Sequence, residues 1–353
     1  MTAPTSSPRP ATVDVADVRA LRARRHRRLA LVLGVLAAAI LALATLALVI
    51  GPASLPPGKA VAALFGVGDA GDLFIVQRLR LPRILAALLA GAAFALAGAL
   101  FQSTLRNPLA SPDILGISGG ASLGAVTCLL GFGLSGLGVA AGAFVGAATV
   151  ALLIWFFAWR SGLHAIRFVL VGVGFSYLAS SLLAFELASV DQRDAASALV
   201  WTVGSVADVR GAELWVLGGG LTVLALAVAA TARWQSALAL GDDHASGLGV
   251  RADRARVVTL ALAVAIVAVA TSVVGPLAFV ALVAPAIARR LLDDGGPALG
   301  VAVGTGAALV LASDLVAQHG LFGVSAPTGI VTGLVGAPYL LWLLATHDRR
   351  TRS

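Results

Sequence analysis

The stretch from Arg80 to Ala121, RLPRILAALLAGAAFALAGALFQSTLRNPLASPDILGISGGA, decides the fold class. It holds two apolar runs joined by a polar connection, 102–113, which Pro108 and Pro112 interrupt. Each run has about the 20 residues that a helix needs to cross a hydrocarbon core of about 30 Å. The pattern therefore predicts two consecutive membrane-spanning helices with a short polar turn between them.

The composition of the whole chain agrees with this prediction. Of its 353 residues 59% are hydrophobic and 12% are charged, whereas a soluble protein has about 25% charged residues. We therefore predict an all-α polytopic membrane protein, because no polar shell could cover so much apolar surface. About ten transmembrane helices are expected, near 29–50, 84–103, 113–131, 137–159, 167–188, 213–232, 256–274, 277–292, 298–317 and 328–345. The run at 277–292 is short enough to tilt or to cross only in part.

The basic residues predict the orientation. When loops are assigned alternately to the two sides, 19 of the 25 Lys and Arg fall on the side of both termini. By the positive-inside rule both termini are cytoplasmic. We thus expect a basic, partly disordered cytoplasmic tail at 1–28, a single transmembrane domain at 29–345 with a cytoplasmic loop at 233–255, and a cytoplasmic C-terminal tail at 346–353. The arginines at 22–28 are typical of the flank of a first span, and no nucleic-acid partner is expected.

Several kinds of chemistry are disfavoured. The only lysine, Lys59, lies in Pro-Gly-Lys-Ala without the spacing of a phosphate-binding loop, so any ATP would bind to another subunit. Gly116-Ile-Ser-Gly119 resembles the serine motif of rhomboid proteases, but the five histidines lie in tails, loops or at span ends. A serine nucleophile needs a base within reach. These glycines are better explained as packing positions and as the entry to a short, discontinuous helix.

Two carboxylates inside predicted spans, Glu186 and Asp314, lie near span ends. A proton- or sodium-coupled carrier usually keeps carboxylates near the membrane midplane, so this scarcity argues against such a carrier. We expect both groups to be structural or solvated at the outer interface.

A weak internal sequence similarity relates Asn107-Pro-Leu-Ala110 to Gly275-Pro-Leu-Ala278. The two copies would cross the membrane in opposite senses, which is what an inverted repeat produces. Coincidence in a chain so rich in Ala, Gly and Leu is an equal alternative.

Five spaced motifs, in order between about residues 78 and 345, resemble the iron-siderophore permeases of ABC importers, a family that includes the vitamin B12 permease. Within it the nearest likeness is to the ferric enterobactin permease subunits. The motifs are Arg80-Leu-Pro-Arg83; Gln102 with Arg106-Asn107-Pro108-Leu-Ala110, Pro112 and Leu115-Gly116; Gly241-Asp242-Asp243 with Ala245 and Leu248-Gly249; Gly275-Pro276 with Phe279, Pro285 and Arg289; and Pro327-Thr-Gly329 with Thr332, Gly336 and Pro338.

The resemblance implies a fold and a set of partners. Two permease chains of ten spans each would enclose a pathway, and a dimer of cytoplasmic ABC ATPases would bind beneath them. The two permeases are expected to form a heterodimer, with a homodimer as the alternative. An extracytoplasmic siderophore-binding lipoprotein or periplasmic protein would deliver the cargo. The chain itself would be a transporter subunit of the inner membrane and not an enzyme, and no cofactor is expected.

The resemblance also implies residue roles. The segment 239–250 matches the ATPase-coupling loop, with Gly241, Asp242, Asp243, Ala245, Leu248 and Gly249 at the matching positions. It is long enough to protrude and is expected to contain a short helix. Arg80 and Arg83 match arginines that pair with carboxylates of the binding protein, and interfacial snorkelling is the alternative for both. The remaining motif residues are expected to be structural.

The chain departs from the family pattern at three sites: Ala286 replaces a histidine, Gln318 replaces a basic residue, and Ser325-Ala326 precedes Pro327 in place of an acidic residue and leucine. The expected function is transport of a ferric siderophore from the binding protein into the cytoplasm. Cobalamin or haem as the cargo of the same architecture is the alternative, and a channel or secondary carrier is a remote one.

Overall fold

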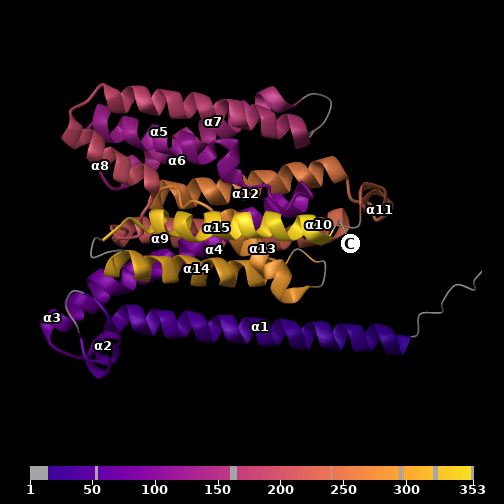
Figure 1. Ribbon diagram of the computed structural model, residues 1–353, viewed down its shortest axis with the longest axis horizontal. Helices are drawn as coiled ribbons and strands as arrows, with labels where there is room; N and C mark the ends of the chain where they lie inside the picture. Colours follow the sequence, from indigo (N-terminus) through magenta and orange to yellow (C-terminus); the bar gives the residue numbers. More distant parts are fainter. Residues whose placement is uncertain are drawn as a thin grey trace, which may run out of the picture.

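The computed structural model describes residues 15–51, 55–159, 165–239, 241–293, 296, 298–320 and 325–350. The predicted all-α fold is confirmed, and these residues contain helices and no strand (Figure 1). The elements are α1 (Val15–Val49), α2 (Pro57–Leu64), α3 (Ala70–Leu73), the π-helix η1 (Phe74–Arg80), α4 (Leu81–Thr104), the 3₁₀-helix η2 (Pro112–Leu115), α5 (Ile117–Val126), the π-helix η3 (Thr127–Gly131), α6 (Leu137–Ala158), α7 (Ala165–Ala188), α8 (Gln192–Val203), α9 (Gly211–Ala230), α10 (Ala232–Ala239), α11 (Asp242–Gly247), α12 (Ala252–Val274), α13 (Val280–Leu292), α14 (Leu299–His319) and α15 (Thr328–Arg350).

Each of the ten predicted spans coincides with a helix, but the ten are not equivalent. Within the part of the chain that the structure describes, seven helical segments are long and apolar enough to cross a membrane: Arg19–Val49, Ala70–Thr104, Leu137–Ala158, Ile166–Ala188, Gly211–Ala230, Ala252–Val274 and Leu299–His319. Two further apolar helices, Ile117–Gly131 and Thr328–Leu343, are shorter. The tenth, α13, has 13 residues. At 1.5 Å per residue α13 is about 20 Å long, which is shorter than a hydrocarbon core of about 30 Å. That this segment tilts or crosses only in part stays a prediction.

The helices extend beyond the predicted spans at both termini. α1 begins at Val15, within the segment predicted as a basic tail, because arginine, alanine and leucine are strong helix formers. α15 likewise continues to Arg350. Residues 1–14 and 351–353, which carry the rest of the predicted tails, lie outside the described residues.

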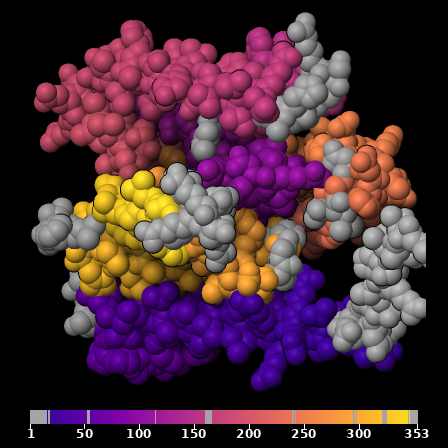
Figure 2. All heavy atoms as spheres, turned by 45° about the vertical axis from the view of Figure 1, so that its right-hand side comes forward, coloured from indigo at the N-terminus to yellow at the C-terminus, as the bar shows by residue number. Residues whose placement is uncertain are grey.

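The helices form one bundle around α4, which contacts α9, α12, α13 and α14. In Figure 1, α2, α3 and α8 lie at one end of the bundle, and α10 and α11 lie at the other. We call these the α2 end and the α11 end. Figure 2 shows α1 along one edge of the molecule and α7 with α8 along the opposite edge, with α14 and α15 between them.

Glycines allow the central helices to approach closely. A methyl group at Gly98 of α4 would overlap the backbone carbonyl of Ala281 in α13, and Gly91 packs against Gly306 of α14 in the same way. α5 and α6 meet through Gly124 and Gly142, each of which faces the other's backbone. Small residues at such contacts are the usual basis of helix association in membranes, where lipid provides no hydrophobic drive.

The connections hold helices that the hydropathy pattern did not predict. α2, α3 and η1 occupy the long connection 51–82, and α8 occupies 189–212. α2 and α8 are too short to cross a membrane, whereas α3 and η1 continue directly into α4. The connection 233–255 contains α10 and α11, so the predicted short helix near 239–250 is present.

Candidate docking and coupling sites

The two arginines predicted to dock a binding protein lie at the α2 end, and both make intramolecular hydrogen bonds. Arg80 ends η1, and its Nη1 donates to the backbone carbonyl of Leu48 at the end of α1. Arg83 lies in the first turn of α4 and forms a two-pronged ion pair with Asp314 of α14, with N–O distances of 2.9 Å for both prongs. Their docking role therefore remains a prediction, and these contacts give each arginine a structural role as well.

Asp314 is the centre of a buried polar cluster. Its side chain is 1% exposed and accepts four hydrogen bonds: two from Arg83, one from Gln318 Nε2 at 2.8 Å and one from Thr328 Oγ1 at 2.8 Å. The expectation of a structural role for Asp314 agrees with this geometry, whereas solvation does not. The sequence pattern identified Gln318 as a departure but did not connect it, or Thr328, to Asp314.

Glu186, the other carboxylate inside a predicted span, lies near the end of α7. It accepts a hydrogen bond of 2.6 Å from Thr127 Oγ1 in η3. Its second oxygen is buried without a hydrogen-bond partner. The contact ties α7 to η3, which is also a structural role.

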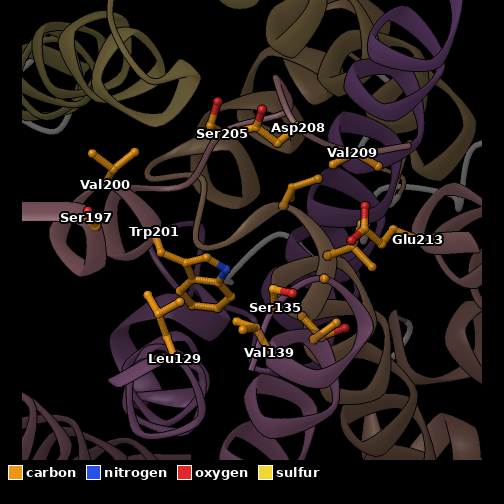
Figure 3. Close-up of a pocket in the computed structure, with 15 residues that line it drawn as sticks. Leu129, Ser135, Val139, Ser197, Val200, Trp201, Ser205, Asp208, Val209 and Glu213 are labelled. Carbon is orange, nitrogen blue, oxygen red and sulfur yellow. The ribbon is translucent and has the colours of Figure 1, made fainter. Parts of the chain in front are cut away.

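A cavity of about 280 Å³ lies at the α2 end, bounded by the start of α6, by α8, by the connection 204–210, by the start of α9 and by the end of α12. Figure 3 shows Trp201 on one side of it and Glu213 on the other, with Ser205 and Asp208 along one rim. Glu213 also accepts a hydrogen bond from the backbone N–H of Arg210, which caps α9. The cavity combines an aromatic wall with acidic and hydroxyl groups.

The connection from α4 to η2, residues 105–111, lies at the α11 end. Arg106 adopts a positive φ of 49° and donates from Nη2 to the backbone carbonyl of Leu238 in α10, at 2.9 Å. Gln102, buried in the last turn of α4, donates to the carbonyl of Leu282 in α13 at 3.1 Å. These two motif residues therefore join α4 and its connection to α10 and α13.

The remaining motif residues of this connection shape the entry to α5. The side chain of Asn107 accepts a hydrogen bond from the N–H of Leu109, which closes a tight turn around Pro108. Pro112 starts η2, where its missing N–H costs nothing. Gly116 has a φ of 76° and packs against the backbone of Ser176 in α7. The glycine is therefore the entry to a short helix, as predicted.

The second connection, 275–279, leads from α12 into α13. Gly275 and Phe279 have positive φ values of 70° and 66°. The backbone at Gly275 and Pro276 packs against Gly204, and Phe279 packs against Gly336 of α15. The other motif residues lie in helices or just before them: Pro285 within α13, Arg289 in its last turn, Pro327 before α15, and Gly329 and Pro338 within α15.

The predicted coupling loop forms α11 and its two flanking turns. Gly241, with a φ of 107°, precedes the helix, which begins at Asp242, and Gly249, with a φ of 76°, follows it. Ala245 is fully buried against the bundle, whereas Asp243 and Gly249 are exposed and Leu248 is 65% exposed. Leu248 directly follows α11. A single exposed apolar side chain is common on protein surfaces, so the predicted coupling role of this segment stays a prediction.

Sequence reasoning also missed a polar cluster near the start of α5. Ser118 donates to Asp113 at 2.7 Å, and Ser111 donates to the other oxygen of the same carboxylate at 3.4 Å. The hydroxyl of Ser118, in the motif that resembles a protease serine, is therefore bonded to a carboxylate within the turn that starts α5. The Ser-x-Asp spacing before Gly116 is the signal that could have revealed this turn.

Comparison with known proteins identifies the chain. The model of the FecCD transport family matches residues 19–346. The chain belongs to the FecCD transport family. It is 36% identical over 300 residues to the ferric enterobactin transport system permease protein FepG of Escherichia coli, covering 85% of this chain and 91% of that protein. It is 40% identical over 314 residues to the achromobactin transport system permease protein CbrC of Dickeya dadantii, covering 86% and 88%.

The fold of this FecCD member matches a solved structure described as an inward-facing conformation of a metal-chelate type ABC transporter. The TM-score is 0.78 at 26% sequence identity, and the match covers 90% of this chain and 99% of that one. The resemblance to iron-siderophore and B12 permeases is confirmed, and the chain is a multi-pass transport permease of an ABC importer. Transport permeases are not themselves enzymes.

Proposed function

We propose that this FecCD permease carries a ferric siderophore across the inner membrane into the cytoplasm, as one subunit of an ABC importer. The observation that carries the proposal is the identity of 36% to a ferric enterobactin permease over most of both chains. A polar chelate cannot dissolve in hydrocarbon, so its passage needs a protein pathway that opens to one side at a time.

The orientation we propose places the α11 end in the cytoplasm. It rests on the excess of Lys and Arg in the connections assigned to that side and in both tails. The α2 end, with Arg80, Arg83 and the cavity beside Trp201, then faces the binding protein. Arginines at such a rim would steer an acidic partner onto the permease.

The energy would come from a dimer of ABC ATPases bound at α11. Ala245 anchors this helix to the bundle, and Leu248 and Asp243 are available to a partner. Closure of the ATPases would push α11, and the bond from Arg106 to Leu238 in the adjoining α10 would pass the displacement to the connection that precedes α5.

A second permease chain would complete the pathway. The cavity of about 280 Å³ at the α2 end is below the roughly 300–1,000 Å³ of typical ligand sites. A larger hollow, about 400 Å³, lies between α5, α6 and α7, but apolar residues line nearly all of it. We therefore infer that the pathway forms between two chains, in a heterodimer with a similar permease, with lipid covering the other exposed apolar faces.

Uptake of radiolabelled iron tests the proposal. Cells that lack this chain, and cells in which it is restored, receive several ferric siderophores, with labelled cobalamin and haem in parallel. We expect restoration of uptake for one ferric siderophore. If iron uptake is unchanged while cobalamin or haem uptake is restored, the importer architecture is supported and the proposed cargo is wrong.

A further inference from the structure

The carboxylate of Asp314 links several elements at the α2 end. Asp314 joins α14 to α4 through Arg83 and to the first residue of α15 through Thr328. Thr328 Oγ1 also accepts a hydrogen bond of 3.4 Å from the N–H of Val206. The cluster thus contacts the connection 204–210 that follows α8.

Backbone contacts extend this cluster. The N–H of Gly329 donates to the carbonyl of Gly204 at 3.0 Å, and the N–H of Ser205 donates to the carbonyl of Val274 at 2.8 Å. A methyl group at Gly329 would overlap the carbonyl of Val203. The ends of α8 and α12 and the start of α15 are therefore packed backbone to backbone, directly beside Asp314.

The two members of the ion pair differ in exposure. The side chain of Asp314 is 1% exposed and that of Arg83 is 22% exposed. A guanidinium has five N–H donors, and Asp314 takes two from Arg83. A carboxylate that approaches from outside the bundle can therefore reach Arg83, but it cannot reach Asp314.

We propose that Asp314 is the positioning residue of the docking site. Its ion pair with Arg83 keeps the connection 204–210 packed against the start of α15, and so keeps the α2 end closed, until a carboxylate of the binding protein replaces Asp314 as the partner of Arg83. This inference rests on the proposed docking of such a protein at this end. A buried carboxylate that loses its counterion is strongly unfavourable. Conformations in which 204–210 and the start of α15 separate, so that water reaches Asp314, then become the favoured ones.

Spin-label distances test the proposal. The full-length chain in lipid nanodiscs carries labels at Ala196→Cys on α8 and Ile330→Cys on α15, in a background of Cys128→Ser that removes the single cysteine. Both label positions are exposed. In the wild-type pair we expect one short distance, which lengthens when the cognate binding protein is added.

Neutral substitutions separate charge from packing. Arg83→Gln leaves Asp314 buried and unpaired, and we expect the long distance without any binding protein. Adding Asp314→Asn to that variant removes the buried charge, and we expect the short distance to return and to stay short when the binding protein is added. Asp191→Asn, an exposed acidic position before α8, is the matched control and should behave as wild type.

Two results would overturn the inference: a short distance in Arg83→Gln, or a double variant as open as Arg83→Gln alone. A purely structural ion pair predicts the second result, because the double variant then lacks the same bonds. The distance measurement needs no cargo. If the double variant restores the short distance but the chain supports no siderophore uptake, the role of Asp314 is supported and only the proposed cargo is wrong.

Discussion

At the scale of single residues, the main lesson concerns Arg83 and Asp314. The sequence motif assigned Arg83 to a partner protein and left Asp314 as a span-end carboxylate. Their separation of 231 residues gives no local signal of contact, yet the side chains meet at 2.9 Å. A carboxylate inside an apolar bundle needs a cation and further donors, and Arg83, Gln318 and Thr328 supply them.

Gly98 provides a residue-scale prediction. Gly98→Ala places a methyl group on the backbone of Ala281, so α4 and α13 must separate. We expect a loss of about 1–3 kcal/mol in stability, as for other overpacked sites. The thermal unfolding midpoint in detergent measures it. Gly219→Ala in α9, where nothing lies within 4 Å, is the control and should not lower the midpoint; an equal effect at both positions would refute the packing argument.

At the scale of elements, two irregular connections lead into short helices. The connection 105–116 leads into α5 and the connection 275–279 into α13, and both contain residues with positive φ. One connection contacts α10 at the α11 end, and the other packs beside Gly204 at the α2 end. This opposite placement is what an inverted repeat predicts, and the repeat stays a prediction.

Coupling through α11 gives an element-scale prediction. Gly249 has a φ of 76°, which costs an L-residue roughly 1–2 kcal/mol, and it lies two residues after the end of α11. We expect Gly249→Leu to reorient α11 and to lower siderophore uptake at least tenfold while ATP hydrolysis by the assembled importer persists. Parallel uptake and phosphate-release assays measure this. Gly300→Leu at the start of α14, also in open space, should leave both rates unchanged. Normal uptake by Gly249→Leu would remove α11 from the coupling path.

At the scale of the whole molecule, the proposed orientation predicts which surfaces face each side. In a Cys128→Ser background, Asp191→Cys lies at the α2 end and Asp243→Cys in α11, and both positions are exposed. A membrane-impermeant maleimide applied to intact cells whose outer membrane has been opened should label Asp191→Cys at once. It should label Asp243→Cys only after the inner membrane is permeabilised. Labelling in the reverse order would show that the proposed orientation is wrong.

The sequence by itself determined the class of protein, the ten helical segments and the family, because apolar length and ordered motifs are local properties of the chain. It also predicted the short helix in the coupling loop and the short length of the segment near 277–292. Only the tertiary structure decided that Arg83 pairs with Asp314 and that α8, α12 and α15 meet beside this pair. These contacts join residues far apart in the chain, and helix packing, not local pattern, selects them.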